Sequence, residues 1–261
     1  MGQPMQDATT SPEMPLVRRL EAVGFRAWPA EHVAYDGSWL IRLTSGHSSR
    51  RLNSINPLDP SDSRDIAGRL EKASARFADY GRQLTVRQTP LTPPALIAHM
   101  DDNGWQSFAG SIVMIADIPR NESNDGIERL PTRDIGRFVD ARVQICPGEQ
   151  SVKAGLAEII AAIKPEIGLF VFEDAETGPE AVSLAVHDND LAGLLQLAVA
   201  ADKRKQGIAT AVAQASLRWA RLRGARQAWL AVETENHAAR ALYAKFGFRE
   251  VYRYVYRRPG E

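Results

Sequence analysis

The stretch LAVAADKRKQGIATAVAQASLRWA, from Leu197 to Ala220, predicts a strand, a turn and a helix in direct succession. The apolar run that ends at Val199 is typical of a strand, and Gly207 follows a basic turn. Beyond Gly207, apolar side chains recur at steps of three and four residues, which is typical of an amphipathic helix. These apolar positions are Ile208, Val212, Ala215, Trp219 and Leu222. Gly224 follows two arginines and can adopt the left-handed conformation that ends a helix.

The start of this helix has the properties of an anion site. Free N–H groups of a first helical turn point at one spot, where the helix dipole adds positive potential. Gly207 has no Cβ and Ala209 is small, so a phosphate can approach the main chain, with Lys203, Arg204 and Lys205 at the rim. The common fingerprints G-x-x-x-x-G-K-[ST] and G-x-G-x-x-G are absent from this stretch. A basic turn before an ordinary helix is the alternative interpretation.

Composition limits the class of protein. The 261 residues suffice for one large domain or two small ones, and an apolar fraction of 44% is ordinary for a globular chain. The 32 basic and 32 acidic side chains cancel, which disfavours a nucleic-acid-binding protein. Cys146 is the only cysteine, so a disulfide framework and a Cys-rich zinc site are excluded. The polar N-terminus and the absence of a long apolar run favour a cytoplasmic protein without a membrane segment.

The order of the predicted elements indicates two halves. A disordered tail is expected over residues 1–14, followed by a helix that ends at Gly24 and a hairpin that turns at Ser45-Gly46. The segment 119–128 is polar and aperiodic, so we expect it to link a domain at 15–118 to a second domain at 129–261. The second domain should begin with a helix that Thr132 could cap. Strands in series followed by a strand–helix–strand unit predict an α/β (α+β) fold with a mixed central sheet.

Three motifs of the second half together resemble the Gcn5-related N-acetyltransferase (GNAT) superfamily. The segment from Arg204 to Ala209 resembles the R/Q-x-x-G-x-G/A loop of that family. The runs LQLAV and LAVETEN resemble its fourth and fifth strands. The segment from Asn236 to Phe248 resembles its N-x-x-A-x-x-L-Y-x-x-x-G-F ending at every fixed position. The resemblance extends from about Pro131 to the C-terminus.

The resemblance implies acetyl-CoA as co-substrate, with no metal. It implies that the main chain of the fourth strand pairs with the pantetheine and that the loop amides hold the pyrophosphate. The implied cofactor-binding residues are Leu197, Ala198, Val199, Arg204, Lys205, Gln206, Gly207, Ile208, Ala209, Thr210, Asn236 and Tyr243. For Asn236, the residue type and position also predict a helix N-cap, and the two roles are compatible.

Acetyl transfer to an amine requires a deprotonated amine, a stabilised oxyanion and a proton for the leaving thiolate. The resemblance implies that Tyr243 donates that proton and that a backbone N–H of the strand ending at Val199 binds the oxyanion. Glu233 ends the next strand and is a candidate base, although a carboxylate near a helix N-terminus is an equally good interpretation. His187 and Asp188 are weaker candidate bases. Cys146 could act as a nucleophile, but an incidental thiol is the better interpretation, because direct transfer needs no nucleophile.

The first half repeats the strand–turn–helix rhythm of the second, but Met100 stands where the second half has Tyr243. No loop signature precedes its helices. We therefore expect a degenerate GNAT-like half, with chance similarity of two βα units as the alternative. Arg51, Asn53 and Ser54 could line an acceptor cleft or form an ordinary polar strand face.

The favoured function is an N-acetyltransferase that transfers the acetyl group of acetyl-CoA directly to an amine in a ternary complex. The alternative is a non-catalytic acyl-CoA-binding regulator on the same fold. The expected partner is a small-molecule or protein amine, with neither nucleic acid nor membrane. The expected oligomeric state is a monomer or a homodimer.

Overall fold

The computed structural model describes residues 13–119 and 129–260, so most of the expected tail and linker lie outside the described residues. The described residues form seven α-helices: α1 Met14–Ala27, α2 Ile66–Asp79, α3 Pro94–Asp102, α4 Ile135–Ile145, α5 Lys153–Ala162, α6 Ile208–Leu222 and α7 His237–Ala244. They also form ten strands: β1 His32–Asp36, β2 Trp39–Leu43, β3 Ser54–Pro57, β4 Val86–Gln88, β5 Gln106–Asp117, β6 Glu166–Asp174, β7 Gly178–Asp188, β8 Leu191–Val199, β9 Gln227–Glu233 and β10 Arg249–Arg258. Three short 3₁₀ helices complete them: η1 Arg50–Leu52, η2 Pro147–Val152 and η3 Ala201–Lys203.

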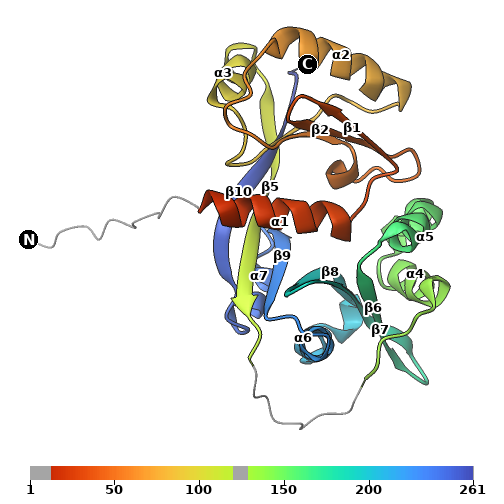
Figure 1. Ribbon diagram of the computed structural model, residues 1–261. Coiled ribbons are helices and arrows are strands. Elements are labelled where there is room, and N and C mark those ends of the chain that lie inside the picture. The colour runs from red at the N-terminus through yellow and green to blue at the C-terminus, as the bar shows by residue number, and fades with distance from the viewer. Residues whose placement is uncertain (1–12, 120–128, 261) are drawn as a thin grey trace, which may run out of the picture.

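All ten described strands belong to one sheet, in the order β1-β2-β3-β4-β10-β5-β9-β8-β7-β6. Two neighbouring pairs, β3–β4 and β8–β9, are parallel and the other paired strands are antiparallel, which confirms the expected mixed sheet. β10, the last strand, pairs with β4 of the first half, while β5 of the first half pairs with β9. β5 and β10 therefore run through both halves, and the C-terminus ends beside α2 and α3 (Figure 1).

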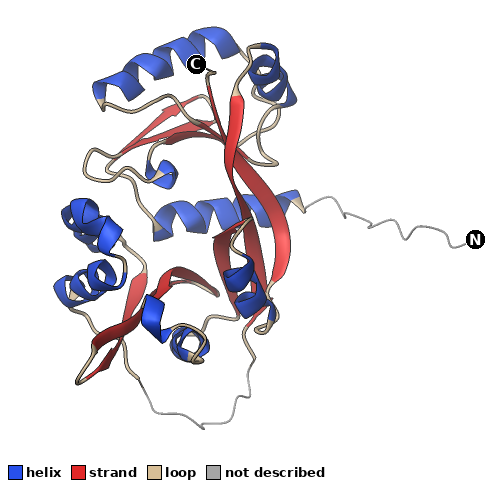
Figure 2. Ribbon diagram, turned by 180° about the vertical axis from the view of Figure 1, so that it is seen from behind, coloured by secondary structure: helices blue, strands red, loops and turns tan. Residues whose placement is uncertain are grey.

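Helices cover both faces of the sheet in the second half (Figure 2). Successive side chains of a strand point to opposite faces, and β7 shows this alternation in its apolar residues. Val182, Leu184 and Val186 pack in one core cluster with α1, α4 and α5, whereas Ala181 and Ala185 pack in another with α6. The small side chains of the second set allow α6 to lie close to the strand, where the Ser216 hydroxyl donates to the Ser183 hydroxyl at 3.1 Å. Both hydroxyls are fully buried.

α1 crosses the sheet between the two halves (Figure 1). The expectation that this helix ends at Gly24 is wrong, because α1 continues to Ala27. A Cβ at Gly24 would lie 3.6 Å from the indole of Trp229, so the glycine marks the contact between α1 and β9 rather than a helix end.

Two further local expectations differ from the structure. Thr132 does not cap α4; it forms a bridge with Leu169, and the Asp134 side chain caps the helix by accepting from the Arg137 N–H at 2.9 Å. β1 was not expected from the sequence. Its side chains are mostly exposed and lack a clear alternation, because β1 is an edge strand that pairs with β2 alone.

The Glu21 carboxylate ties α1 to the middle of the sheet. Its side chain is buried and accepts hydrogen bonds from the Arg87 guanidinium of β4 and the Tyr252 hydroxyl of β10. Burial acts to lower the pKa of the Arg87 guanidinium, but the Glu21 carboxylate and the neighbouring tyrosines of β10 together outweigh burial and raise that pKa. One carboxylate thus joins three elements that lie far apart in the sequence.

Replacing Glu21 should destabilise the fold strongly. In Glu21→Ala, the Arg87 guanidinium is left buried without a carboxylate, so we expect a loss of about 3 kcal/mol or more in the free energy of unfolding. Urea denaturation monitored by circular dichroism measures it. The control is Glu250→Ala, which breaks the exposed pair with Arg253 and should cost less than about 1 kcal/mol. Equal losses in the two variants would contradict a special role for the buried carboxylate.

Candidate functional site

The sheet divides between β8 and β9. The two strands are parallel partners only from Leu191 to Gly193, after which β8 continues along β7 and β9 continues along β5. A Cβ at Gly193 would lie 2.7 Å from the Trp229 ring, so only glycine allows the indole to cross at the point of divergence. Beyond this point the main chain of residues 194–199 has no pairing with β9. It is therefore available for a ligand to add to the sheet.

A β-bulge sharpens the divergence. The pairing of β7 with β8 shifts register between Val182 and Leu184, and Gln196 lies in the bulge with a φ of +55°. Bulges increase local twist and redirect side chains, and they are common beside active sites. Leu197, Ala198 and Val199 follow the bulge and are half-buried on the separated part of β8.

A cleft of about 670 Å³ occupies the opening between the strands. This volume lies within the range that is usual for small-molecule sites, ~300–1,000 Å³. Four of the catalytic or cofactor-binding residues expected from the sequence line it together: Leu197, Glu233, Asn236 and Tyr243. The opposite wall comes from the first half and from β10, with Trp28, Arg50, Arg51, Tyr254 and Tyr256 among its residues. The first half therefore forms part of the cleft.

Tyr243 lies on α7 at the wall of the cleft. It is 7% exposed, and its ring packs edge-on against Phe248 at a centroid distance of 5.6 Å. Burial among apolar side chains raises the pKa of Tyr243 to about 12, because the charged phenolate would lose its hydration. The hydroxyl therefore remains protonated at neutral pH and can donate a proton or a hydrogen bond.

Asn236 and Glu233 lie where β9 passes into α7. The side-chain oxygen of Asn236 accepts from the Ala239 N–H at 3.0 Å, which confirms the predicted N-cap. The Glu233 side chain is 69% exposed and faces the cleft, with one carboxylate oxygen 4.0 Å from the Arg50 guanidinium. Its position leaves the carboxylate accessible both to solvent and to a molecule in the cleft.

The loop before α6 ends on an open helix N-terminus. Gly207 is the N-cap residue with a φ of +83°, and no side chain caps the first turn. Arg204 donates to the Val199 carbonyl at the end of β8, and Gln206 donates to the Asp202 carbonyl. Lys203 pairs with Glu180 of β7 at 3.4 Å, so its charge is already partnered. Residues 204–210 do not line the cleft itself; they follow the end of β8 directly.

Of the other candidate residues named from the sequence, the structure places only some at the cleft. Arg51 lines the cleft, but Asn53 and Ser54 do not, because both are buried and make internal hydrogen bonds. The Asn53 amide holds the preceding loop by donating to the carbonyls of residues 47 and 49. His187, Asp188 and Cys146 also lie outside the cleft lining.

Two tyrosines of β10, Tyr254 and Tyr256, were not recognised as site residues from the sequence. With Tyr252 they alternate along the strand, so the three share one face of the sheet. That alternation was visible in VYRYVYR, but the partners of this face come from the first half. The Arg87 guanidinium lies 3.8 Å from the centroid of the Tyr254 ring. Burial opposes ionisation of Tyr254, but Arg51 and Arg87 outweigh it and lower its pKa to about 8.

We expect Tyr254 to ionise earlier than an ordinary tyrosine, whose pKa is ~10. An ultraviolet titration should show one tyrosinate forming near pH 8, and Tyr254→Phe should remove that step. Tyr243→Phe should leave it, because the pKa of Tyr243 is about 12. Because the folded pKa is lowered, the stabilisation from this group is complete above pH ~10 and is lost as the pH falls through 8. Tyr254→Phe with an unchanged titration would contradict the assignment.

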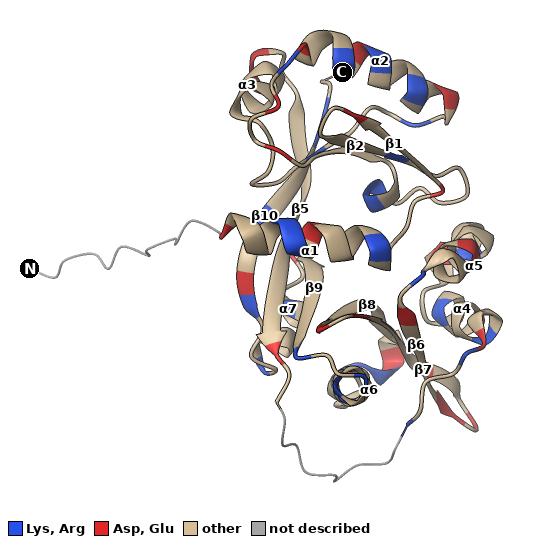
Figure 3. Ribbon diagram, viewed as in Figure 1, with Lys and Arg blue, Asp and Glu red and all other residues tan. Residues whose placement is uncertain are grey.

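Within residues 13–119 and 129–260, no group of three or more His, Cys, Asp or Glu side chains is placed to hold a metal ion. No helix in the same ranges is long and apolar enough to cross a bilayer. Charges of both signs are interspersed along α1 and α2 (Figure 3).

The family follows from a match over nearly the whole chain. Residues 15–257 match the model of the family described as "Probable histone acetyltransferase Rv0428c C-terminal". The chain belongs to this family. The match includes both halves, so the first half is an integral part of the family unit and not an addition to it.

Relatives and solved structures agree with membership of the GNAT superfamily. The uncharacterized N-acetyltransferase YobR of Bacillus subtilis is 25% identical over 249 residues, covering 92% of this chain and 98% of that protein. A GCN5-related N-acetyltransferase from Kribbella flavida shares the fold with a TM-score of 0.69 at 15% identity, over 96% of this chain and 97% of that one. A tandem GNAT protein from the clavulanic acid biosynthesis pathway gives a TM-score of 0.64 at 16% identity, over 97% and 92% of the two chains.

Proposed function

We propose that this protein is an N-acetyltransferase that transfers the acetyl group of acetyl-CoA directly to an amine. The observation that carries the proposal is the divergence of β8 from β9 beside an open helix N-terminus, with Tyr243 on the wall of the cleft between them. These parts offer a free strand edge, an anion site and a protonated hydroxyl. They match the pantetheine, the pyrophosphate and the leaving thiolate of the co-substrate.

The binding residues follow the order of the chain. The main chain of Leu197, Ala198 and Val199 would pair with the pantetheine, and amides of the loop at 204–210 would hold the pyrophosphate. The open space around Gly207, where a Cβ would have no neighbour within 4 Å, leaves room for a phosphate. The Asn236 amide is free to donate to the coenzyme, because only its oxygen is used in the helix cap.

In the transfer, Tyr243 would protonate the leaving thiolate, and a main-chain N–H of β8 near Val199 would bind the oxyanion. The amine must first lose a proton, because an alkyl ammonium has a pKa of ~10.4. Glu233 is the candidate base of the second half, and it faces the cleft as an accessible carboxylate. Tyr254 is a second candidate, because its lowered pKa of about 8 permits it to accept a proton near neutral pH.

The pH dependence of kcat/KM distinguishes the two bases. A rate limited by Tyr254 should rise through pH 8. In that case Tyr254→Phe should abolish the rise while Glu233→Gln retains it. Loss of kcat/KM across the whole pH range in Glu233→Gln, with Tyr254→Phe unaffected, would assign the base to Glu233. A rise that persists in both variants would remove both residues from the role.

The N-terminal half would shape the acceptor side of the cleft. Strand–helix–strand units occur in both halves, as β4–α3–β5 and as β9–α7–β10, and Met100 of α3 is fully buried. We propose that the halves derive from one GNAT-like unit, that their last strands have been exchanged, and that the first half has lost coenzyme chemistry.

The acceptor would be a small-molecule or protein amine. A protein amine is suggested by the family description, which names a probable histone acetyltransferase, whereas the tandem neighbour comes from an antibiotic pathway. A thiol-release screen with small amines, amino acids, aminoglycosides and histone peptides tests the activity, with mass spectrometry of the acetylated product. Acetyl-CoA binding without thiol release from any amine would instead favour a non-catalytic acyl-CoA-binding regulator.

A further inference from the structure

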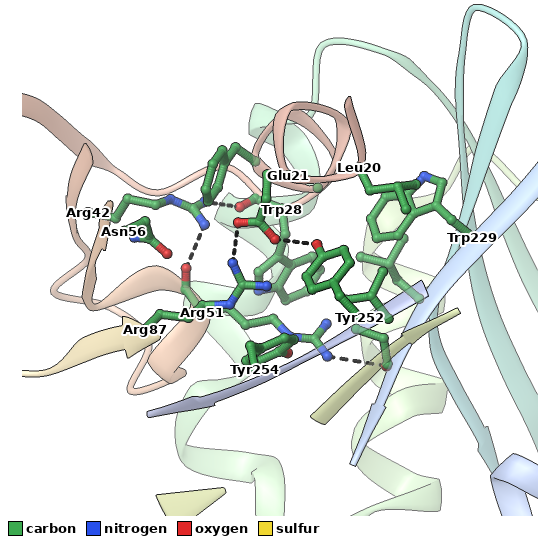
Figure 4. Close-up of a pocket in the computed structure, with 15 residues that line it drawn as sticks. Leu20, Glu21, Trp28, Arg42, Arg51, Asn56, Arg87, Trp229, Tyr252 and Tyr254 are labelled. Carbon is green, nitrogen blue, oxygen red and sulfur yellow. Dashed lines mark hydrogen bonds and ion pairs between the residues drawn. The ribbon is translucent and has the colours of Figure 1, made fainter. Parts of the chain in front are cut away.

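Behind the wall of the cleft lies a small cavity of about 40 Å³, where positive charge gathers. Arg42 of β2, Arg51 of η1 and Arg87 of β4 line this cavity (Figure 4). Glu21 is the only carboxylate among the residues that line this cavity. Three cations therefore face one anion in a largely buried place.

Arg87 and Arg42 are held in different ways. Arg87 forms the ion pair with Glu21, whose other oxygen accepts from Tyr252. Arg42 is 3% exposed and donates only to uncharged groups, the main-chain carbonyls of Trp28 and Arg51. Burial and the neighbouring Arg87 lower the pKa of Arg42 to about 10. Glu21 offsets this effect only in part and makes its ion pair with Arg87, so the buried charge of Arg42 has no carboxylate partner of its own.

Arg51 connects this buried charge to the cleft. It lines both the small cavity and the cleft, as do Trp28 and Tyr254, and it is half-buried. Its guanidinium donates to the Ala231 carbonyl at 3.3 Å. Its contact with Tyr254 supplies no full negative charge at neutral pH, because the pKa of that tyrosine is about 8.

The other arginines of the cleft already have carboxylates. Arg142 makes a bidentate pair with Glu149 at 2.7 and 2.9 Å, and Arg50 lies 4.0 Å from Glu233. Across the described residues, Arg51 has no ion pair with Asp or Glu. It is therefore the cleft cation that is available to an anionic ligand.

Building on the function proposed above, we propose that the acceptor amine also carries a carboxylate, which Arg51 binds in the cleft while Arg42 and Arg87 stabilise it from behind. The chemical class is an amino acid or an ω-amino carboxylate. A guanidinium presents parallel N–H donors that match the two oxygens of a carboxylate. A bound carboxylate would also compensate the excess buried charge, which is unfavourable while it is unpaired.

The remaining polar groups of the small cavity are compatible with this occupant. The Glu21 oxygens already accept from Arg87 and Tyr252, so they do not face the ligand as a free anion. The Asn56 side-chain oxygen is buried and has no hydrogen-bond partner among the described residues. A volume of about 40 Å³ suffices for one water, which can donate to Asn56 and to the bound carboxylate.

The test compares matched acceptors in the thiol-release assay. Each set contains an ω-amino carboxylate, an n-alkylamine of equal chain length and the corresponding aminophosphonate. We expect the wild-type protein to favour the carboxylates in kcat/KM. Arg51→Gln should lower kcat/KM for carboxylates at least about 30-fold more than kcat/KM for alkylamines, because any change that it makes to the pKa of Tyr254 affects both kinds of acceptor equally. Arg253→Gln, which removes an exposed arginine paired with Glu250, is the matched control and should behave as wild type.

Several outcomes would overturn the proposal. Alkylamines or histone peptides that react as well as carboxylates would exclude the carboxylate requirement, and a preference for phosphonates would reassign the anion. An equal loss on both kinds of acceptor in Arg51→Gln would show a general structural role. Arg51→Lys keeps the charge and serves if the glutamine variant does not fold, and it should retain part of the preference. The wild-type comparison of matched acceptors needs no variant at all.

A binding measurement separates this proposal from the proposed function. Butanoate and hexanoate lack an amine, so they should raise the melting temperature of the wild type, relative to chloride at equal ionic strength, but not that of Arg51→Gln. Stabilisation through Arg51 without turnover of any amine would support the anion site and contradict the acetyltransferase. Turnover that is indifferent to the carboxylate, with no such stabilisation, would support the enzyme and contradict the anion site.

Discussion

We expect Gly207→Glu to abolish the binding of acetyl-CoA while the protein stays folded. The residue precedes α6 with a φ of +83°, and no side chain caps the first turn. A glutamate there places a negative charge at the dipole end of the helix, where we propose that the pyrophosphate binds, and narrows the approach to the amides. Calorimetry should show affinity weaker by at least about 100-fold.

Gly178→Glu is the matched control for this experiment. Gly178 is the first residue of β7, directly after the β6–β7 turn, with a φ of +81°, and a Cβ at either glycine would have no neighbour within 4 Å. The two variants therefore carry the same added charge and a similar backbone strain of about 1–3 kcal/mol. Only Gly207→Glu should lose the coenzyme. If both variants bind acetyl-CoA as the wild type does, the pyrophosphate must lie elsewhere.

Tyr243→Phe should lower kcat by about 100-fold with little change in the KM for acetyl-CoA. Burial raises the pKa of this tyrosine to about 12, so the wild-type hydroxyl is protonated throughout the usual assay range. The phenylalanine keeps the edge-on contact with Phe248 and removes only the proton donor. Steady-state kinetics with saturating amine measures the effect.

The control for Tyr243 is Tyr35→Phe, which removes the hydroxyl of an exposed tyrosine on the edge strand β1. It should retain wild-type kcat. Full activity of Tyr243→Phe would show that the hydroxyl has no role in proton transfer and that the ring serves packing alone. Protonation by solvent would then suffice, because a thiolate is a good leaving group with a thiol pKa of ~8.5.

The parts of the site that were predictable depend on neighbours in the sequence. The turn into α6 requires a residue that adopts positive φ, and Gly207 supplies it. Asn236 caps α7 through a hydrogen bond to a backbone N–H three residues later. Such features involve a few consecutive residues, so the pattern of glycine, polar cap and apolar period was enough to locate them.

The partners of the strands were not predictable in the same way. The alternation in β10 identifies two faces but not the neighbouring strands, because strands with similar apolar faces can pair in many orders. β10 lies between β4 and β5, and β5 pairs with β9. Gly24 likewise predicted a helix end, whereas α1 continues to Ala27. The indole that lies beside Gly24 belongs to Trp229, about 200 residues away in the chain, and no local pattern indicates that contact.

Local pattern in the amino-acid sequence was therefore sufficient for the strand–turn–helix unit, the cap of α7 and the family resemblance. The cleft itself depends on long-range packing. Arg42 and Arg87 are unremarkable along the chain, and they meet Arg51 beside Tyr254 because the first half and β10 share one sheet. Periodicity and capping act over a few residues, whereas the charge and pKa of a cleft depend on every group that folding brings within several ångströms.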